Sequence, residues 1–131
     1  MTETKYFTVV EARRTLPLVR NIVKDILETT KEIRLIADDL NGKIEDDPKV
    51  KKMVEQVNHF MNELEEIGCF YKDWNFSIGL VDFPAIIEGK DVFLCWKSDE
   101  DDIKYYHEME SGFAGRKLIP EEYFSEKNSS N

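Results

Sequence analysis

Nearly all the residues that could take part in chemistry lie in one segment of the chain, residues 79–116. They are Asp82, Cys95, His107, Glu108, Gly112, Gly115 and Arg116. The sequence has no Ser-His-Asp order, G-x-S-x-G motif or dinucleotide fingerprint, so no spacing in it dictates one reaction.

A metal site is one such chemistry. Asp82, Cys95 and His107 fall on three successive segments that are expected to be strands. If strand pairing aligns them, they offer one oxygen, one sulfur and one nitrogen ligand, which suits zinc or iron with open positions. The alternative is a hydrogen-bonded, structural His107 among aromatic neighbours. Because the register is open, we predict no cofactor and keep a divalent metal as the alternative.

Asp82, His107 and Glu108 are also the candidates for catalysis. His107 and Glu108 are adjacent, so on a strand their side chains point to opposite faces and cannot hold one metal together without a bulge. In an enzyme, His107 would be a ligand or a general base. The carboxylate of Asp82 has a structural alternative, which is to accept backbone N–H groups at a strand end before Pro84.

The segment Gly112-Phe113-Ala114-Gly115-Arg116 suggests an anion site. Its backbone N–H groups could cradle an anion, with the guanidinium of Arg116 as a clamp. It lacks the lysine and the strand-then-helix context of a phosphate loop. We favour the simpler interpretation, in which Gly112 and Gly115 permit a tight reversal and Arg116 forms an ion pair with Asp82 or Glu108.

These residues follow a long helical region. Thr8 and Glu11 form the pattern of a capping box, which predicts a helix from Val9. Pro17 cannot donate to a carbonyl four residues earlier, so we predict a short helix over 9–14 and a second, longer helix from near Leu16. Thr15 is well placed to cap that second start.

Apolar residues at spacings of three and four continue this helix to about residues 41–42, and the same pattern recurs up to Ile67. Asp47 and Pro48 suit the start of the next helix and Gly68 its end. The short connection predicts an antiparallel hairpin over residues 9–67, resembling a coiled coil. Its first helix, about 38 Å long, would protrude from a domain whose radius of gyration is about 14 Å. We therefore expect a homodimer or another protein partner, the alternative being a monomer whose sheet covers the apolar stripe.

Past Gly68 the pattern changes to short β-branched and aromatic runs. They cover residues 69–72, 80–83, 92–96 and 103–107 and predict three or four antiparallel strands. Residues 88–91 are expected to be a turn, and the acidic run at 98–102 a solvated one. The chain is thus predicted to be a single α+β domain over residues 1–127. Its hairpin covers 9–67, its small sheet and the GFAGR segment cover 69–124, and a frayed tail covers 128–131.

Composition excludes several partners. The net charge is −9 and both halves are acidic, so nucleic acids and anionic membrane surfaces are disfavoured. No apolar run is long enough for a signal peptide or a membrane span, and the two cysteines are too few for a disulfide framework. We therefore expect a cytoplasmic protein with reduced thiols.

Three blocks carry a family resemblance: residues 79–85 (GLVDFPA), 92–96 (VFLCW), and 106–108 (YHE) followed by 112–116 (GFAGR). In these the chain resembles the bacterial domain-of-unknown-function family 2203, and the match covers almost the whole chain. Tyr106 stands where many members have a tryptophan. The resemblance implies a small bacterial cytosolic protein with helices followed by a small sheet, and it supplies no activity.

Two hypotheses for function follow from these observations. The preferred one is association, in which the hairpin pairs with a second copy or binds another protein. The alternative is a metal-dependent or anion-binding enzyme with a site around Asp82, His107, Glu108 and Arg116. Whether the protein is an enzyme stays open at this point.

Overall fold

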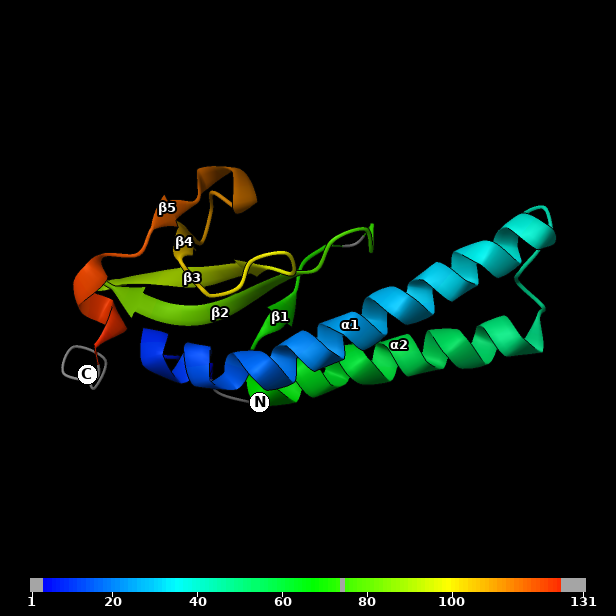
Figure 1. Cartoon of the computed structure of the whole chain (residues 1–131), viewed down its shortest axis with the longest axis horizontal. Coiled ribbons are helices and arrows are strands. Elements are labelled where there is room, and N and C mark those ends of the chain that lie inside the picture. The colour runs from blue at the N-terminus through cyan, green and yellow to red at the C-terminus, as the bar shows by residue number, and fades with distance from the viewer. Residues whose placement is uncertain (1–3, 74, 126–131) are drawn as a thin grey trace.

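A computed structural model of the protein describes residues 4–73 and 75–125. Two long helices, α1 (Val9–Asp39) and α2 (Pro48–Ile67), precede an antiparallel sheet of five strands (Figure 1). The strands, in sheet order, are β1 (Phe70–Tyr71), β2 (Leu80–Ile87), β3 (Lys90–Lys97), β4 (Tyr105–Glu108) and β5 (Lys117–Leu118). Two short 3-10 helices, η1 (Phe113–Gly115) and η2 (Glu121–Phe124), flank β5. The predicted α+β class is confirmed, with five strands where three or four were expected. The predicted tail at 128–131 lies outside the described residues.

The predicted capping box at the start of α1 is confirmed. The Thr8 hydroxyl accepts from the Glu11 N–H at 3.0 Å, and the Glu11 carboxylate accepts from the Thr8 N–H at 2.9 Å. The predicted break before Pro17 is wrong, since α1 is continuous and the Thr15 hydroxyl donates to the Glu11 carbonyl instead of capping a new helix.

Burial explains why α1 continues through Pro17. Proline in a helix interior costs about 3 kcal/mol, chiefly through one lost hydrogen bond and a steric clash. Ala12, Leu16 and Val19 are buried on both sides of it, and each large apolar side chain contributes about 1.5–3 kcal/mol. Tertiary packing thus outweighs the local preference.

The predicted limits of α2 agree with the structure. The Asp47 carboxylate accepts from the Val50 N–H at 3.0 Å, and Pro48 follows it in the first turn. Gly68 ends the helix with a φ of 112°, a left-handed conformation that favours glycine. Val50, Met53 and Val57 of α2 are buried in the hairpin.

The β2–β3 hairpin is longer than predicted because its turn has two residues, Glu88 and Gly89, both with positive φ. β2 also continues through Pro84. The Pro84 carbonyl accepts from the Phe7 N–H at 2.7 Å. Because N–H and C=O of one strand residue point to the same side, the missing Pro84 N–H lies away from β3 and costs no bond with it.

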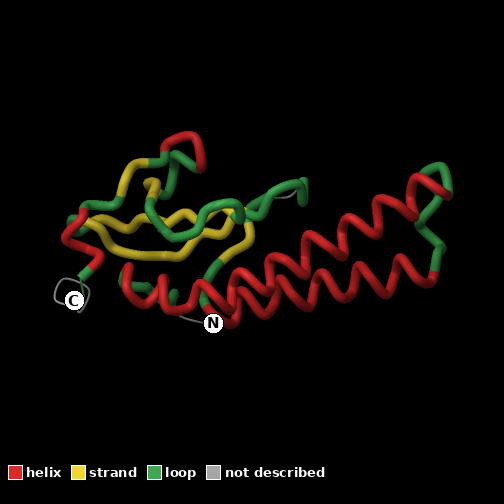
Figure 2. The backbone as a smooth tube through the Cα atoms, in the orientation of Figure 1, coloured by secondary structure: helices red, strands yellow, loops and turns green. Residues whose placement is uncertain are grey.

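One face of the sheet forms the core with α1. Val81, Phe83, Leu94 and Trp96 are fully buried there, together with the apolar residues of the first half of α1. Figure 2 shows this half of the hairpin beneath the strands, whereas the other half extends past the sheet. Asp82 and Cys95 alternate with these core residues and so belong to the opposite face of the sheet.

In the half of the hairpin that extends past the sheet, α1 and α2 bury side chains against each other within one chain. Leu35, Leu40 and Val54 stay exposed on it. Association through the hairpin stays a prediction. Within the described residues, neither α1 nor α2 has a sufficiently long apolar stretch to cross a lipid bilayer.

Gly79, the first residue of the GLVDFPA block, provides a test of the contact between the sheet and α1. A methyl group at Gly79 would overlap Cγ1 of Val23. We expect Gly79→Ala to lower the free energy of unfolding by about 1–3 kcal/mol, measured by urea denaturation. In a Val23→Ala background the same change should cost much less. An equal loss of unfolding free energy in both backgrounds would show that the contact with Val23 is not the reason why glycine occupies position 79.

Candidate functional site

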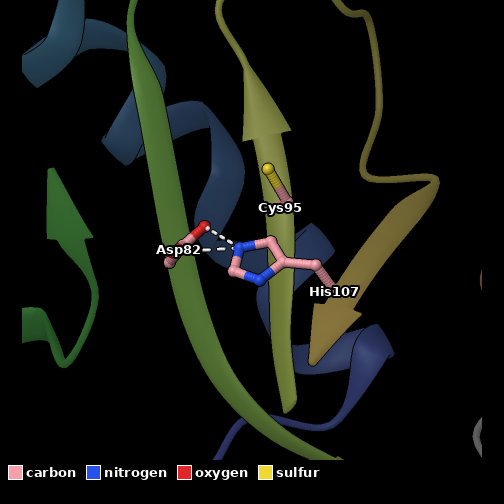
Figure 3. Close-up of side chains that lie close together, drawn as sticks. All are labelled: Asp82, Cys95 and His107. Carbon is pink, nitrogen blue, oxygen red and sulfur yellow. Dashed lines mark hydrogen bonds and ion pairs between the residues drawn. The ribbon is translucent and has the colours of Figure 1, made fainter. Parts of the chain in front are cut away.

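The sheet brings Asp82, Cys95 and His107 together (Figure 3). Asp82 of β2 lies opposite Cys95 of β3, and Cys95 lies opposite Tyr105 of β4. His107, two residues after Tyr105, therefore shares the same face. One ligand atom of each of the three side chains lies within 4.8 Å of the others, and all three residues are buried.

His107 is held at both ring nitrogens. Nε2 lies 3.1 Å and 3.2 Å from the two carboxylate oxygens of Asp82, and Nδ1 lies 2.9 Å from the Glu108 carbonyl. Because a carbonyl can only accept, Nδ1 carries a proton and donates it.

Burial sets the acidity of the other two groups. It raises the pKa of Asp82, an effect opposed by the charge and hydrogen bond of His107 and by the charge of Lys72. Burial, together with the charge of Asp82, raises the pKa of Cys95 to about 12. Cys95 is therefore a thiol at neutral pH. Nε2 of His107, the ring nitrogen that would have to activate Cys95, faces the Asp82 carboxylate. A cysteine nucleophile of the protease type does not fit this arrangement.

Glu108 does not join the cluster through its side chain. As its place next to His107 predicts, it belongs to the other face of β4, where it is exposed and lies 3.8 Å from Lys90 and 3.9 Å from Lys117. Its contribution is the main-chain carbonyl that accepts from His107.

Arg116 forms an ion pair, but with a partner that differs from the expected Asp82 or Glu108. Its Nη2 donates to the Glu100 carboxylate at 2.7 Å and 2.8 Å and to the Cys95 carbonyl at 3.2 Å. Glu100 is itself fixed, because it accepts from the Lys97 N–H at 2.8 Å. The guanidinium also lies over the Tyr105 ring, 4.1 Å from its centroid.

The glycines of the GFAGR segment form a tight reversal. Gly112 has a φ of 63°, and its carbonyl accepts from the Gly115 N–H at 3.0 Å. The Arg116 N–H donates to the Phe113 carbonyl. Two backbone N–H groups of the segment, those of Gly115 and Arg116, thus already have partners inside it.

Two features of the site have no signal in the sequence. Glu100 belongs to the acidic run at 98–102, where a solvated turn is expected, and its spacing does not distinguish it from the other acidic residues. The second feature is a pocket of about 280 Å³ above the cluster. Its lining consists of Asp82, Cys95 and His107 together with Lys72, Leu80, Phe93, Met109, Gly112 and Phe113. Because these residues are far apart in the sequence, no motif or spacing connects them.

Fold and site together define an α+β protein with a helical hairpin and a buried Asp-Cys-His cluster beside a pocket. The chain belongs to the family described as "Uncharacterized conserved protein (DUF2203)", whose model matches residues 5–119. The predicted resemblance is thereby confirmed, and the match includes the hairpin, the cluster and the GFAGR segment. No curated protein and no solved structure matches the chain. The family description names no activity, so function has to be argued from the site.

The Asp82–His107 contact predicts a large effect on stability. Removing one partner of a buried pair leaves the other without compensation, at a cost of about 3–5 kcal/mol. We expect His107→Ala to lower the free energy of unfolding by roughly this amount in the protein without added metal. The measurement is urea denaturation of His107→Ala, Asp82→Asn and the double variant. The double variant should lose less unfolding free energy than the sum of the losses in the two single variants. A melting temperature that is unchanged or raised in His107→Ala would argue against this structural role.

Proposed function

We propose that this protein binds a zinc ion through Asp82, Cys95 and His107. The observation that carries the proposal is the approach of three buried ligand atoms, an oxygen, a sulfur and a nitrogen, to within 4.8 Å of one another. Thiolate, imidazole and carboxylate are the groups that hold zinc in proteins. A thiolate beside an imidazole favours zinc or ferrous iron over magnesium or calcium, which prefer oxygen ligands.

The hydrogen bonds of His107 support this proposal. A histidine that binds a metal with one ring nitrogen generally donates the other N–H to a carbonyl or carboxylate. The bond from Nδ1 to the Glu108 carbonyl has this form and leaves Nε2, which faces the cluster, as the ligand. Glu108 thus supports the site through its main chain.

Charge compensation also favours a cation. A buried carboxylate and a buried thiol lie in contact, and burial raises the pKa of both. A bound zinc ion would replace their protons, because it deprotonates a coordinating thiol outright. The thiol must be reduced for this, as it would be in the cytoplasm that we propose as the location.

The pocket argues for a reactive rather than a purely structural zinc site. Structural sites are closed by four protein ligands, whereas catalytic sites have three and leave one position open. Here three ligands line a pocket of about 280 Å³. Zinc with an open position supplies a polarised water or carbonyl, so the class of reaction would be metal-assisted hydrolysis. Arg116 would have a supporting role, since it holds the Cys95 carbonyl.

Calorimetric titration with zinc tests this proposal. We expect one zinc ion per chain, and Cys95→Ala should weaken binding at least about 100-fold because a direct ligand is lost. At a free zinc concentration about 100 times the dissociation constant, wild-type stability should rise by about 2.7 kcal/mol.

Cys69→Ala is the matched control. Cys69 is the other buried cysteine, its pKa is also raised to about 12 by burial, and it packs in the core on the helix side. Zinc affinity should be unchanged in this variant. Equal zinc binding by wild type and Cys95→Ala, or an equal loss in both variants, would refute the zinc site.

Self-association is the second candidate function, supported by the exposure of Leu35, Leu40 and Val54 on the projecting hairpin. We expect a homodimer in native mass spectrometry and in sedimentation equilibrium. Leu35→Lys with Val54→Lys should shift the protein to monomer, because two charges would have to be buried. Leu118→Lys, at a more exposed position on β5, is the control. A wild type that is monomeric at its highest soluble concentration would contradict this prediction.

A further inference from the structure

The pocket above the cluster differs chemically from the cluster itself. Leu80, Phe93, Met109 and Phe113 give it an apolar lining, and Lys72 is its cation. We propose that it binds a small organic monocarboxylate with an apolar body, whose carboxylate takes the open zinc position beside Lys72. This inference rests on the proposed zinc site and names the class of ligand for it.

The charges around the site favour a single negative charge on the ligand. The two charges of zinc would be balanced by the carboxylate of Asp82 and the thiolate of Cys95, with His107 neutral. The guanidinium of Arg116 is paired with Glu100. The ammonium of Lys72 remains, so the pocket as a whole would carry one positive charge.

Lys72 lies beside the pocket. Its backbone N–H donates to the Leu80 carbonyl at 2.7 Å, which places Lys72 alongside β2. The ammonium lies 5.4 Å from the centroid of the Phe93 ring and 5.8 Å from that of Phe70. Lys72 is exposed and forms no ion pair with a carboxylate among residues 4–73 and 75–125, so a ligand anion would be able to reach its ammonium.

The remaining lining favours an apolar body of limited size. Met109 and Phe113 are 42% and 36% exposed, and a ligand lying between them would remove apolar surface from water. The volume of about 280 Å³ lies just below the usual range of roughly 300–1,000 Å³ for small-molecule sites. A carboxylate with a single ring or a short branched chain fits these limits.

Calorimetry with benzoate tests the inference on zinc-loaded protein whose zinc content is measured in the same sample. Benzamide has the same ring without the charge, and acetate has the charge without the ring. We expect benzoate to bind, and both comparison compounds to bind at least about tenfold more weakly. Lys72→Gln should weaken benzoate binding about tenfold, as expected for loss of one charged contact. Lys90→Gln, an exposed lysine at the far end of β3 and outside the pocket lining, should leave it unchanged.

The outcomes separate this inference from the zinc proposal. Zinc at one ion per chain with no benzoate binding, or with equal binding by wild type and Lys72→Gln, overturns the carboxylate pocket and leaves the zinc site standing. Benzamide that binds as tightly as benzoate overturns the role of the charge. A protein that retains no zinc overturns the proposed function, and with it the carboxylate position proposed here.

Discussion

The contact between His107 and Asp82 is the constraint on which the site depends. It joins β4 to β2 across the intervening strand β3, and both side chains are almost fully buried, with exposed fractions of 4% and 5%. An isolated carboxylate in such a place would be costly, so the imidazole has to stand within hydrogen-bonding distance. This requirement makes the register of three strands matter, since a slip by one residue would move each of these side chains to the opposite face.

The rest of the sheet supports this contact from both sides. On the helix side, α1 covers the core residues of β2 and β3, and its N-terminal end stays helical through Pro17 because those contacts outweigh the proline. On the other side, the reversal at Gly112 returns the chain so that Arg116 reaches Glu100 and the carbonyl of Cys95. The GFAGR segment thus acts on the cluster through main-chain positioning, with its charge already paired. The pocket lies between this segment and Lys72, and for that reason combines apolar walls with one cation.

The hairpin and the cluster lie in different parts of the structure, and the two halves of the hairpin pack differently. The half of the hairpin next to the sheet belongs to the core, and its removal would expose β2 and β3. The projecting half packs mainly against itself, with Val50 and Met53 of α2 buried in the hairpin and outside the main core. This self-packing leaves less apolar surface for a partner than the length of the helices alone indicated. Association and metal binding would therefore use separate parts of the molecule, so the two proposals do not exclude each other.

Local chemistry is what the sequence by itself determined. The capping residues Thr8 and Asp47, the stop at Gly68 and the change from helical to alternating patterns gave the α+β class and most element limits, because each depends on neighbours a few residues away. Alternation along β4 likewise separated the side chains of His107 and Glu108. Tertiary structure decided the rest. It kept α1 continuous through Pro17, paired Arg116 with Glu100, and set the strand register that brings Asp82, Cys95 and His107 to one place. These outcomes depend on packing between segments that are distant in the sequence. The energy of this packing exceeds the local conformational preferences, and no periodic pattern in the sequence indicates it.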